Sequence, residues 1–401
     1  MLSMRRWLWI AALAAAAPAG AAQWQTVLQA DLEGGVVSVP QDTNSGVSGT
    51  LLGDVDLAPA LKFDNGGLLN PLIYASANGQ SRPIDEETLY VRSYALGMRP
   101  TYTHTLGWTL LGGGWSAGAR LLATHVWNQE ALDETFGQGV YDYEEFGGGL
   151  LLRKAAGSLD DQLNLDFSHR DYPNYHDPGA DVTGDRNYYV KDSYFWRLGF
   201  RHRDRLSDDK VLTANVRLSE RDYTDSYVVS DVDGTLTGQK QNDLDANVDL
   251  GLAWRLGQAW SVDFGLGYDQ LASNQNLFDT GVAPAQATEN GDNFYDLRID
   301  PGLHWLSGPW SAGATYELLL RQTNHYIQDP DGTYTEGLQA DVEHGLSLSA
   351  DRALGAGLKV RADFAAREVL SNQEFAHGTL ASYSYYNAGL GLVYAWQSGA
   401  H

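Results

Sequence analysis

The sequence predicts an all-β fold, a transmembrane antiparallel up-and-down β-barrel of about 16 strands. Apolar and polar residues alternate with period two over many segments that are longer than ten residues. Short and long connections alternate along the chain, and tryptophans gather beside the short ones. A tilted strand needs about 9–11 residues to cross a bilayer, whereas strands of globular sheets usually have about 5–6. The long segments therefore favour a membrane barrel over a soluble sandwich.

The composition excludes several classes of protein. The 401 residues contain 27 Lys+Arg and 51 Asp+Glu, so the formal net charge is −24. Such a chain has few groups to neutralise phosphates, and no nucleic-acid partner is expected. The absence of cysteine excludes disulfides, thiolate zinc sites and a lipid-modified N-terminal cysteine. The 43% apolar content and the 44 glycines suit strands with one apolar face better than a thick soluble core.

The N-terminal segment has the features of a secretory signal peptide. Arg5 and Arg6 precede an apolar run over residues 7–17, and small residues follow at 19–21. The run is too short for a membrane-spanning helix, which needs about 20 apolar residues, although an N-terminal anchor is the alternative. We therefore expect residues 1–22 to be a signal peptide and residues 23–401 to form the barrel.

Period-two alternation is clearest over residues 244–256. Leu244, Leu250 and Trp254 fall on one face, and Asp245 and Asp249 fall on the other. Similar patterns predict sixteen strands, near residues 25–39, 51–63, 71–79, 88–105, 115–127, 143–155, 161–172, 191–205, 211–224, 242–256, 260–273, 293–306, 310–324, 337–353, 358–371 and 379–396. Fourteen strands stay open as the alternative, because the third segment is short and the glycine-rich residues 106–114 are an awkward turn.

The connections between these strands differ in length at the two ends of the predicted barrel. Short ones fall at residues 157–160, 207–209, 257–259, 307–309 and 355–357, and long ones near 128–142, 173–190, 225–241, 274–292 and 325–336. Outer-membrane barrels have short periplasmic turns and long outer loops. An even number of strands then places both termini in the periplasm.

Aromatic residues predict two girdles at opposite ends of the strands. Tryptophans at the predicted periplasmic ends are Trp115, Trp254, Trp260, Trp305, Trp310 and Trp396, and tyrosines at the other ends are Tyr172, Tyr194, Tyr223, Tyr268, Tyr295 and Tyr326. Indole and phenol rings prefer the headgroup boundary because each has an apolar body and a polar group. This sorting fits a wall that spans a bilayer.

The final strand, residues 386–396, resembles the C-terminal signal of Gram-negative outer-membrane β-barrels. In that family the chain usually ends on the last aromatic residue, whereas Gln397 to His401 follow Trp396 here. The resemblance implies a multi-pass protein of the cell outer membrane in contact with outer-membrane lipid and lipopolysaccharide. It also implies the barrel-assembly machinery as a partner during biogenesis, and it leaves the oligomeric state open.

Two loop segments share the pattern Asp-x-Asp-Gly-Thr-x-Thr. The first, with Asp231 and Asp233, resembles the nucleophile motif of haloacid-dehalogenase-type phosphatases. That family needs an α/β sheet, which the strand pattern excludes, so we expect a loop turn and no enzymatic activity. The second copy contains Asp329 and Asp331. The alternative for both is Ca²⁺ binding in the outer loops, because clustered carboxylates suit a hard cation.

Charged residues share the predicted inward phase of four neighbouring strands. The predicted pore-lining residues are Arg197, Arg201, Arg203, Arg217 and Arg221 on two strands and Asp243, Asp245, Asp249, Asp263 and Asp269 on the next two. Facing stripes of opposite charge would set up a transverse field, and cross-strand ion pairs are the alternative. Residues 274–292 and 173–190 are the candidate constrictions. Histidines show no metal spacing, and His169, His202 and His344 fall on the apolar phase.

These observations predict a water-filled channel for small solutes that prefers cations, because about 16 strands enclose a wide lumen and the chain is acidic. One alternative is an export or surface-assembly conduit, for polysaccharide or lipoprotein, that works with periplasmic partners. Another is a plugged structural or surface-binding barrel that acts through its long outer loops.

Overall fold

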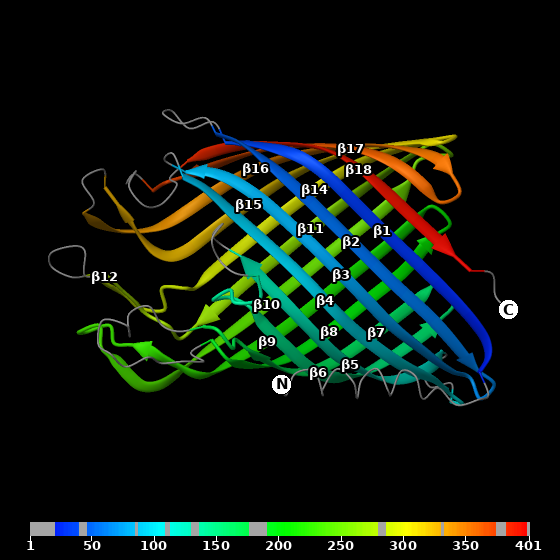
Figure 1. Ribbon diagram of the computed structural model, residues 1–401, viewed down its shortest axis with the longest axis horizontal. Helices are drawn as coiled ribbons and strands as arrows, with labels where there is room; N and C mark the ends of the chain where they lie inside the picture. Colours follow the sequence, from blue (N-terminus) through cyan, green and yellow to red (C-terminus); the bar gives the residue numbers. More distant parts are fainter. Residues whose placement is uncertain are drawn as a thin grey trace.

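The computed structural model describes residues 21–39, 46–84, 87–108, 113–129, 136–175, 191–279, 286–329, 333–373 and 382–398. Sixteen antiparallel strands close into one barrel in which sequence neighbours pair and the last strand pairs with the first (Figure 1). The predicted 16-strand barrel is confirmed, and the 14-strand alternative is wrong. In the described part of the chain no helix is long and apolar enough to cross a membrane.

The wall follows the order of the sequence. Its strands are β1 (Ala21–Val39), β2 (Gly46–Phe63), β3 (Gly67–Ile84), β4 (Glu87–Leu106), β5 (Gly114–Gln129), β6 (Tyr143–Ala156), β7 (Leu159–Asp171), β8 (Ser193–Ser207), β9 (Lys210–Val229), β10 (Leu236–Arg255), β11 (Trp260–Ser273), β14 (Phe294–Ser307), β15 (Trp310–Gln328), β16 (Tyr334–Gly355), β17 (Leu358–Ser371) and β18 (Tyr383–Gln397). The hairpin of β12 (Leu277–Asp279) and β13 (Gln286–Thr288) forms a separate two-stranded sheet between β11 and β14.

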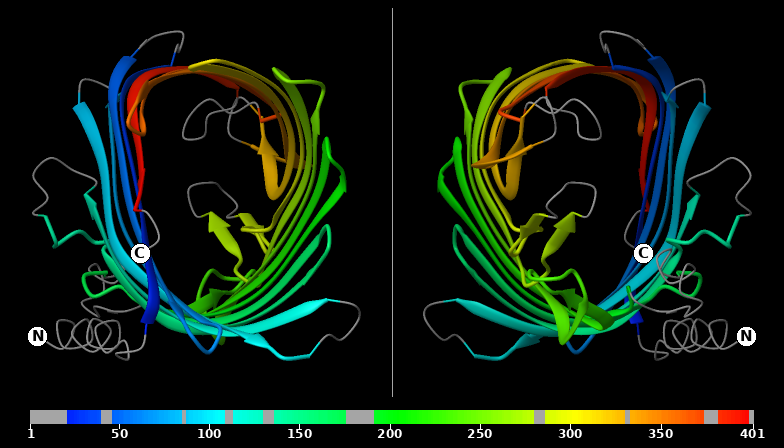
Figure 2. Two further views of the ribbon diagram at one scale, coloured as in Figure 1. Left: turned by 90° about the vertical axis from the view of Figure 1, so that its right-hand side faces the viewer. Right: turned by 90° about the vertical axis from the view of Figure 1, so that its left-hand side faces the viewer.

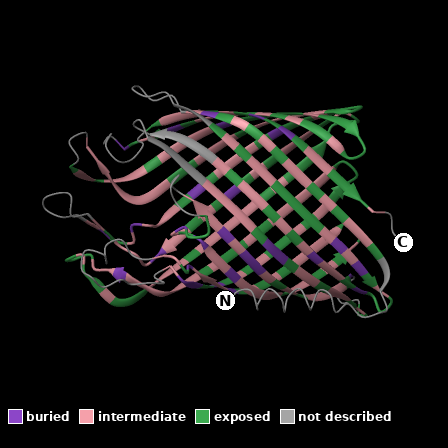
Figure 3. Cartoon of the chain, viewed as in Figure 1, coloured by how far each residue is buried: buried purple, intermediate pink, exposed green. Residues whose placement is uncertain are grey.

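The register sorts the side chains of the wall into two faces, because residues directly opposite in neighbouring strands share a face. Leu250 pairs with Leu266, and both are exposed; their neighbours Asp249 and Gly267 pair on the other face. Exposed and less exposed residues alternate along the strands in Figure 3. One face is thus apolar and uncovered, and the other carries most of the charges.

The charged face lines the lumen. Arg197 of β8 forms an ion pair with Glu145 of β6, and the contact reaches across β7. Strands two apart are separated by about 10 Å, so their side chains converge on the concave side of the wall. The apolar face, with residues such as Leu390 at 68% exposure, is therefore the outside of the barrel.

At the rim with the short connections, tight turns join neighbouring strands. Gly157 and Gly308, at the turns β6–β7 and β14–β15, have φ of +60° and +57°. This left-handed conformation costs glycine little and fits the twist of two-residue hairpins. The N-terminal end of β1 and the C-terminal end of β18 lie at this same rim (Figure 1).

The opposite rim, with the long connections, is held by side chains that accept backbone hydrogen bonds. Asn274 accepts the amide of Asn242 at 2.8 Å, and Asn293 accepts that of Ser273 at 2.5 Å. Asn372, Asp192 and Asp142 act in the same way on the amides of Ala340, Tyr172 and Asn128, at 2.8, 2.7 and 2.6 Å. These caps satisfy donors where the strand ladder ends.

The hairpin β12–β13 lies over this second mouth. It lies at the left-hand end of the barrel in Figure 1 and within the outline of the wall in Figure 2. Its base is tied to β9, since Asn276 donates to the carbonyl of Val229 at 2.7 Å and Gln275 accepts the Val229 amide at 2.9 Å. The predicted constriction 274–292 therefore includes an element over the opening. Most of the other predicted constriction, residues 176–190, lies outside the described residues.

Candidate functional site: the charged lumen

The lumen face of β5–β9 is rich in arginine, and we call this region the basic arc. The register places on it Arg120, Arg153, Arg170, Arg197, Arg201, Arg203, Arg217 and Arg221, with the carboxylates Glu145, Asp160 and Asp166. Arginine therefore exceeds carboxylate on these five strands, although the whole chain is acidic.

The next three strands, β10, β11 and β14, carry the opposite charge, and we call them the acidic arc. Their lumen face bears Asp243, Asp245, Asp249, Asp263, Asp269, Asp296 and Asp300, with Arg255 and Arg298 as the cations. The ten predicted pore-lining residues thus all lie on the lumen face, with the five arginines in the basic arc and the five aspartates in the acidic arc.

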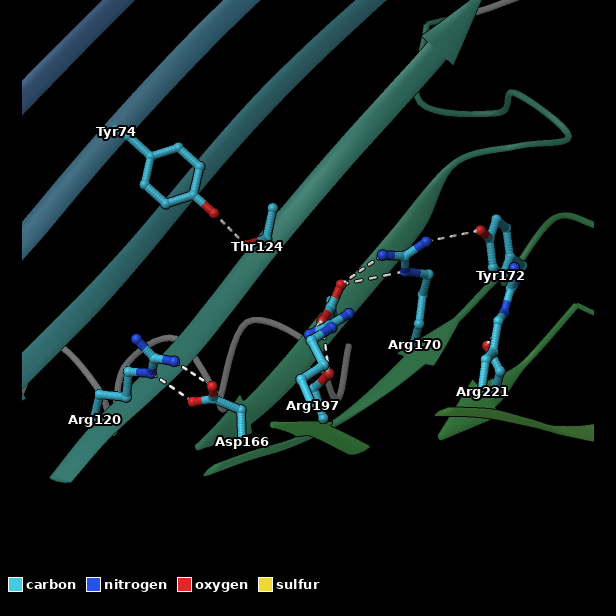
Figure 4. Close-up of polar contacts among 11 residues, drawn as sticks. Tyr74, Arg120, Thr124, Asp166, Arg170, Tyr172, Arg197 and Arg221 are labelled. Carbon is cyan, nitrogen blue, oxygen red and sulfur yellow. Dashed lines mark hydrogen bonds and ion pairs between the residues drawn. The ribbon is translucent and has the colours of Figure 1, made fainter. Parts of the chain in front are cut away.

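Glu145 is the most enclosed carboxylate of the basic arc. Its side chain is only 7% exposed and accepts hydrogen bonds from Ser168 Oγ at 2.6 Å, Arg170 Nη2 at 2.8 Å and Arg197 Nη1 at 2.8 Å. Glu145 lies on β6, and the two arginines that donate to it, Arg170 of β7 and Arg197 of β8, are labelled in Figure 4. One negative charge therefore holds two positive charges.

A third arginine joins this group through an aromatic ring. Arg170, Arg197 and Arg221 lie 4.7, 4.5 and 5.2 Å from the ring centre of Phe195. Guanidinium groups are attracted to the face of an aromatic ring. Arg221 donates to Ser193 Oγ at 3.0 Å and to the carbonyl of Lys191 at 3.4 Å, which are neutral oxygens. The cluster therefore has an excess of positive charge near the long-connection mouth.

Closer to the middle of the wall, Arg120 on β5 and Asp166 on β7 form a bidentate ion pair (Figure 4). Tyr74 on β3 shares a 2.5 Å hydrogen bond with Thr124 on β5, again across an intervening strand. Such contacts fix the positions of lumen side chains from alternate strands. They leave the wall lined with polar groups of defined orientation.

Solvent reaches arginines in the middle of β8 and β9, close to the boundary with the acidic arc. Arg201 and Arg217 are 51% and 58% exposed, and Arg217 lies 3.8 Å from Asp245. Arg298 is held more tightly, at 2.7 Å from Asp249. The exposed guanidinium groups lie in mid-strand positions on the lumen face, so the interior is open to water at this depth.

The wall opposite the basic arc mixes both charges. Arg361 of β17 bonds to Asp351 of β16 at 2.9 Å and to Asp31 of β1 at 3.2 Å. Arg367 contacts both Glu317 and Glu343. Several lumen oxygens in the described residues lack a protein hydrogen-bond partner: Asp31 Oδ1, Asp269 Oδ1, Asp300 Oδ1, Asp363 Oδ2 and Asn387 Oδ1. Buried polar atoms of this kind are normally satisfied by an ordered water molecule.

A cavity of about 750 Å³ lies at the short-connection mouth of the basic arc. Arg153, Arg203, Arg205 and Arg255 line it together with Asp160 and the turn residues Asp208 and Asp209. Arg153 and Asp160 are joined by a 2.6 Å hydrogen bond. Arginines and aspartates of the basic arc are balanced at this mouth, and Arg255 of the acidic arc adds a fourth arginine.

The six predicted girdle tryptophans all lie at the short-connection end on the apolar face. Trp260 pairs directly with Trp305, and Trp254 pairs with Val262. Trp115, Trp310 and Trp396 pair with Leu106, Ser307 and Leu28 of the neighbouring strands. Trp24 at the start of β1 is 49% exposed and adds a seventh member. Among the tyrosines, two depart from the expectation. Tyr223 lies on the lumen face and donates to Asp243 at 3.0 Å, and Tyr172 is buried with its hydroxyl accepting from the lumen residue Arg170 at 3.4 Å.

The candidate metal ligands are only partly described. Asp233 accepts hydrogen bonds from the backbone and hydroxyl of Thr235 at 3.2 and 2.8 Å, inside a turn that Gly234 completes with φ of +71°. Asp331 lies outside the described residues, and no group of three or more metal-binding side chains occurs within them. Neither Asp231 nor Asp329 is therefore brought into such a group there, and Ca²⁺ binding stays a prediction.

The three outward histidines each have a partner in the wall. His202 lies 2.6 Å from Asp161, His169 lies 3.1 Å from Asp171, and His344 shares a 2.7 Å hydrogen bond with Tyr316.

Sequence reasoning missed Glu145, Arg170 and the Arg120–Asp166 pair as lumen residues. The period-two phase of β6 and β7 contained that signal, but the contacts across an intervening strand depend on barrel curvature.

The comparisons with known proteins find solved structures that are similar to this chain but no matching protein family. No protein-family model matches this chain, and no curated protein is similar to it. Among solved structures, OccAB3 of Acinetobacter baumannii is 10% identical, with a TM-score of 0.45 and coverage of 94% of this chain and 99% of that chain. OmpT, an outer membrane protein of Vibrio cholerae, is 12% identical, with a TM-score of 0.42 and coverage of 93% and 99%. The TodX monoaromatic hydrocarbon channel is 11% identical, with a TM-score of 0.41 and coverage of 94% and 90%.

Proposed function

We propose that this protein is an outer-membrane channel for small polar solutes, with no enzymatic role. The observation that carries the proposal is the exposure of mid-wall lumen arginines, 51% for Arg201 and 58% for Arg217. Side chains cannot fill the interior of a barrel of this strand number, and porins of about 16–18 strands enclose water. Charged groups on the lumen face then stay hydrated while the apolar face contacts lipid.

The proposal includes the location. The exposed apolar face and the tryptophans at one rim support insertion in a bilayer, with outer-membrane lipid and lipopolysaccharide as the surrounding partners. Both strand termini at the short-connection rim support periplasmic ends, because short turns face the periplasm in such barrels. Assembly by the barrel-assembly machinery belongs to the same proposal.

Selectivity is proposed to come from both arcs. The net charge of −24 and the acidic arc favour cations overall. The basic arc beside the acidic arc orients solutes that carry both charges, since a transverse field acts on their dipoles. We therefore expect cation preference, with zwitterionic solutes passing more readily than neutral ones of the same size.

Planar-bilayer recording tests the channel. Refolded barrel, verified by its mobility shift on heating, is expected to give stable conductance steps and a reversal potential on the cation side in a salt gradient. A correctly folded and inserted barrel without conductance would contradict the proposal. It would favour the alternative of a plugged, surface-binding barrel, to which the hairpin β12–β13 over the mouth points.

A further inference from the structure

The apolar belt on the outside of the barrel is not equally tall around the circumference. On five strands the outward residues form an apolar run of at least 11 residues, at residues 51–63 of β2, 244–254 of β10, 295–305 of β14, 310–320 of β15 and 386–396 of β18. An outward run of 11 residues spans about 25 Å along the membrane normal, at about 3.3 Å per residue and a tilt of about 40°. That height matches the usual hydrocarbon-facing band.

The strands β6–β9 have a much shorter run. Their outward apolar residues are limited to 146–152 of β6, 163–167 of β7, 194–200 of β8 and 212–218 of β9. The same geometry gives these runs a height of only about 10–15 Å. A short run also occurs on β16, where His344 and Arg352 point outward, but its neighbours β15 and β17 have longer runs. Within the described residues, only on β6–β9 are four adjacent strands short, so the deficit is greatest on that side of the barrel.

Charged and polar residues end the run on the side of the short connections. Lys154, Asp161 and His202 are successive partners across β6, β7 and β8, and all three point outward. His202 Nδ1 and Asp161 Oδ1 are 2.6 Å apart, and each side chain is 27% exposed. On β11 the corresponding outward residues after the short turn are Val262 and Phe264. Asp161 thus takes a place that is apolar elsewhere.

Polar outward residues also end the run on the other side. Glu144 of β6 lies 3.1 Å from His125, and His169 of β7 lies 3.1 Å from Asp171. Glu220 of β9 is outward and pairs with Trp196 of β8. The short run is therefore bounded at both ends by ionisable groups, which are costly in hydrocarbon.

Tryptophan is absent from the short-connection ends of β6–β9, and β2, β3, β4, β16 and β17 contain none either. Tryptophans at the short-connection rim belong to β1, β5, β10, β11, β14, β15 and β18. The strands β6–β9 contain only Trp196, which lies toward the other end of β8. The side with the short belt thus also lacks the residues that mark the usual headgroup level.

We propose that the bilayer is locally thinned along β6–β9, so that lipid headgroups and water reach Asp161 and His202. Lipid rather than a second copy of the chain is the occupant that fits. The remaining apolar residues are uncovered, with Leu150, Leu163 and Leu165 at 63%, 44% and 47% exposure, and so require hydrocarbon. The polar groups bond to one another within the wall and need only hydration. Bilayers accommodate short hydrophobic segments by thinning.

The inference rests on the membrane location proposed above and not on conduction. The cysteine-free chain allows one nitroxide label at a single introduced cysteine. Leu163→Cys and Phe264→Cys are matched, because each is the fifth residue of a strand that follows a short connection and each points outward. Collision with a water-soluble nickel chelate and with oxygen reports the depth of each label in vesicles of 18-carbon phosphatidylcholine.

The label at 163 is expected to be several-fold more accessible to nickel than the label at 264. Vesicles of 12-carbon lipid should narrow that difference. In Asp161→Leu/His202→Leu, which extends the apolar run, the label at 163 should become as protected from nickel as the label at 264. If this variant fails to fold, the comparison of the labels at 163 and 264 in the otherwise native chain is a sufficient test.

Equal nickel accessibility of the two labels would overturn the inference, and so would shielding of position 163 from both reagents, which would indicate a covering protein copy. A folded barrel that does not enter vesicles would contradict the membrane location itself. A barrel that inserts with the expected label depths at 163 and 264 but does not conduct ions would contradict only the proposed channel function.

Discussion

Arg197 Nη1 lies 2.8 Å from Glu145 Oε1, and the two residues are on β8 and β6, so their ion pair bridges β7. Together with Arg170 at 2.8 Å it places two guanidinium groups on one carboxylate. This relationship joins the stability of the wall to the charge of the lumen, because the same carboxylate both holds the arginines and limits their positive field.

Glu145→Gln is therefore expected to destabilise the barrel. Breaking an enclosed ion pair leaves the partner charges uncompensated, which costs about 2–4 kcal/mol. Urea unfolding in vesicles measures the loss. Asp160→Asn is the matched control, because its partner Arg153 is 48% exposed and such pairs contribute about 0–1 kcal/mol. Equal losses in the two variants would contradict the role given to Glu145.

Arg217→Gln should shift ion selectivity with little effect on stability. Its guanidinium is 58% exposed on the lumen face, so its removal should move the reversal potential further to the cation side. Arg352→Gln is the control, because Arg352 pairs with Trp310 on the outer face. A shift of the same size in both variants would indicate that lumen charge does not set selectivity.

Asn293→Ala should loosen the rim with the long connections. Its side chain accepts the Ser273 amide, and an unsatisfied amide costs about 1 kcal/mol. Hydrogen exchange at Ser273 is expected to accelerate, while exchange in the middle of β11 stays unchanged. Asn215→Ala, in the middle of β9, should leave Ser273 unaffected, and an equal effect there would contradict the local cap.

Asp209 should titrate below the usual range of an aspartate. Hydrogen bonds from Ser207 Oγ and from Trp254 Nε1, at 2.7 and 2.9 Å, lower the pKa of its carboxyl. Because the folded pKa is depressed, this contribution to stability is present above the ordinary pKa of about 4 and is lost as pH falls through the lower folded value. The fluorescence difference between the native chain and Trp254→Phe should follow this low-pH transition.

Asp209→Asn is expected to abolish that fluorescence transition. Asp208→Asn, at the neighbouring position in the same turn, should leave it unchanged. A transition midpoint at or above the ordinary aspartate value in the native chain would contradict the proposed hydrogen bonds.

The wall could be predicted from the sequence because alternation is a local signal. The predicted segment 260–273 coincides with β11, and 242–256 overlaps β10 except for its last residue. The third strand was predicted too short, at 71–79, whereas β3 runs from Gly67 to Ile84. Its pairing with β4 continues through Asn70 and Pro71, where the pairing with β2 is interrupted. Strand ends beyond the bilayer have no apolar face, so β9 and β15 also run further than predicted.

The sequence predicts which side chains face the lumen, but it does not predict which of them contact one another. Arg197 and Asp245 could be placed on one face by counting residues, because side chains alternate strictly. The pairing of Arg197 with Glu145 could not, since it depends on the shear that brings strands two apart together. The hairpin β12–β13 was also missed, because three-residue strands carry too little period-two signal.

The closure of the sheet has a consequence for how the chain folds. Thr26 and Ser398 are hydrogen-bonded in both directions although 372 residues separate them, so the first and last strands meet across almost the whole sequence. Neighbouring hairpins can form early, but β1 and β18 can pair only after the intervening strands are ordered. The closure of the barrel is therefore expected to be slow. Until then both edges expose unpaired backbone groups, and the nascent protein needs protection from aggregation at that stage.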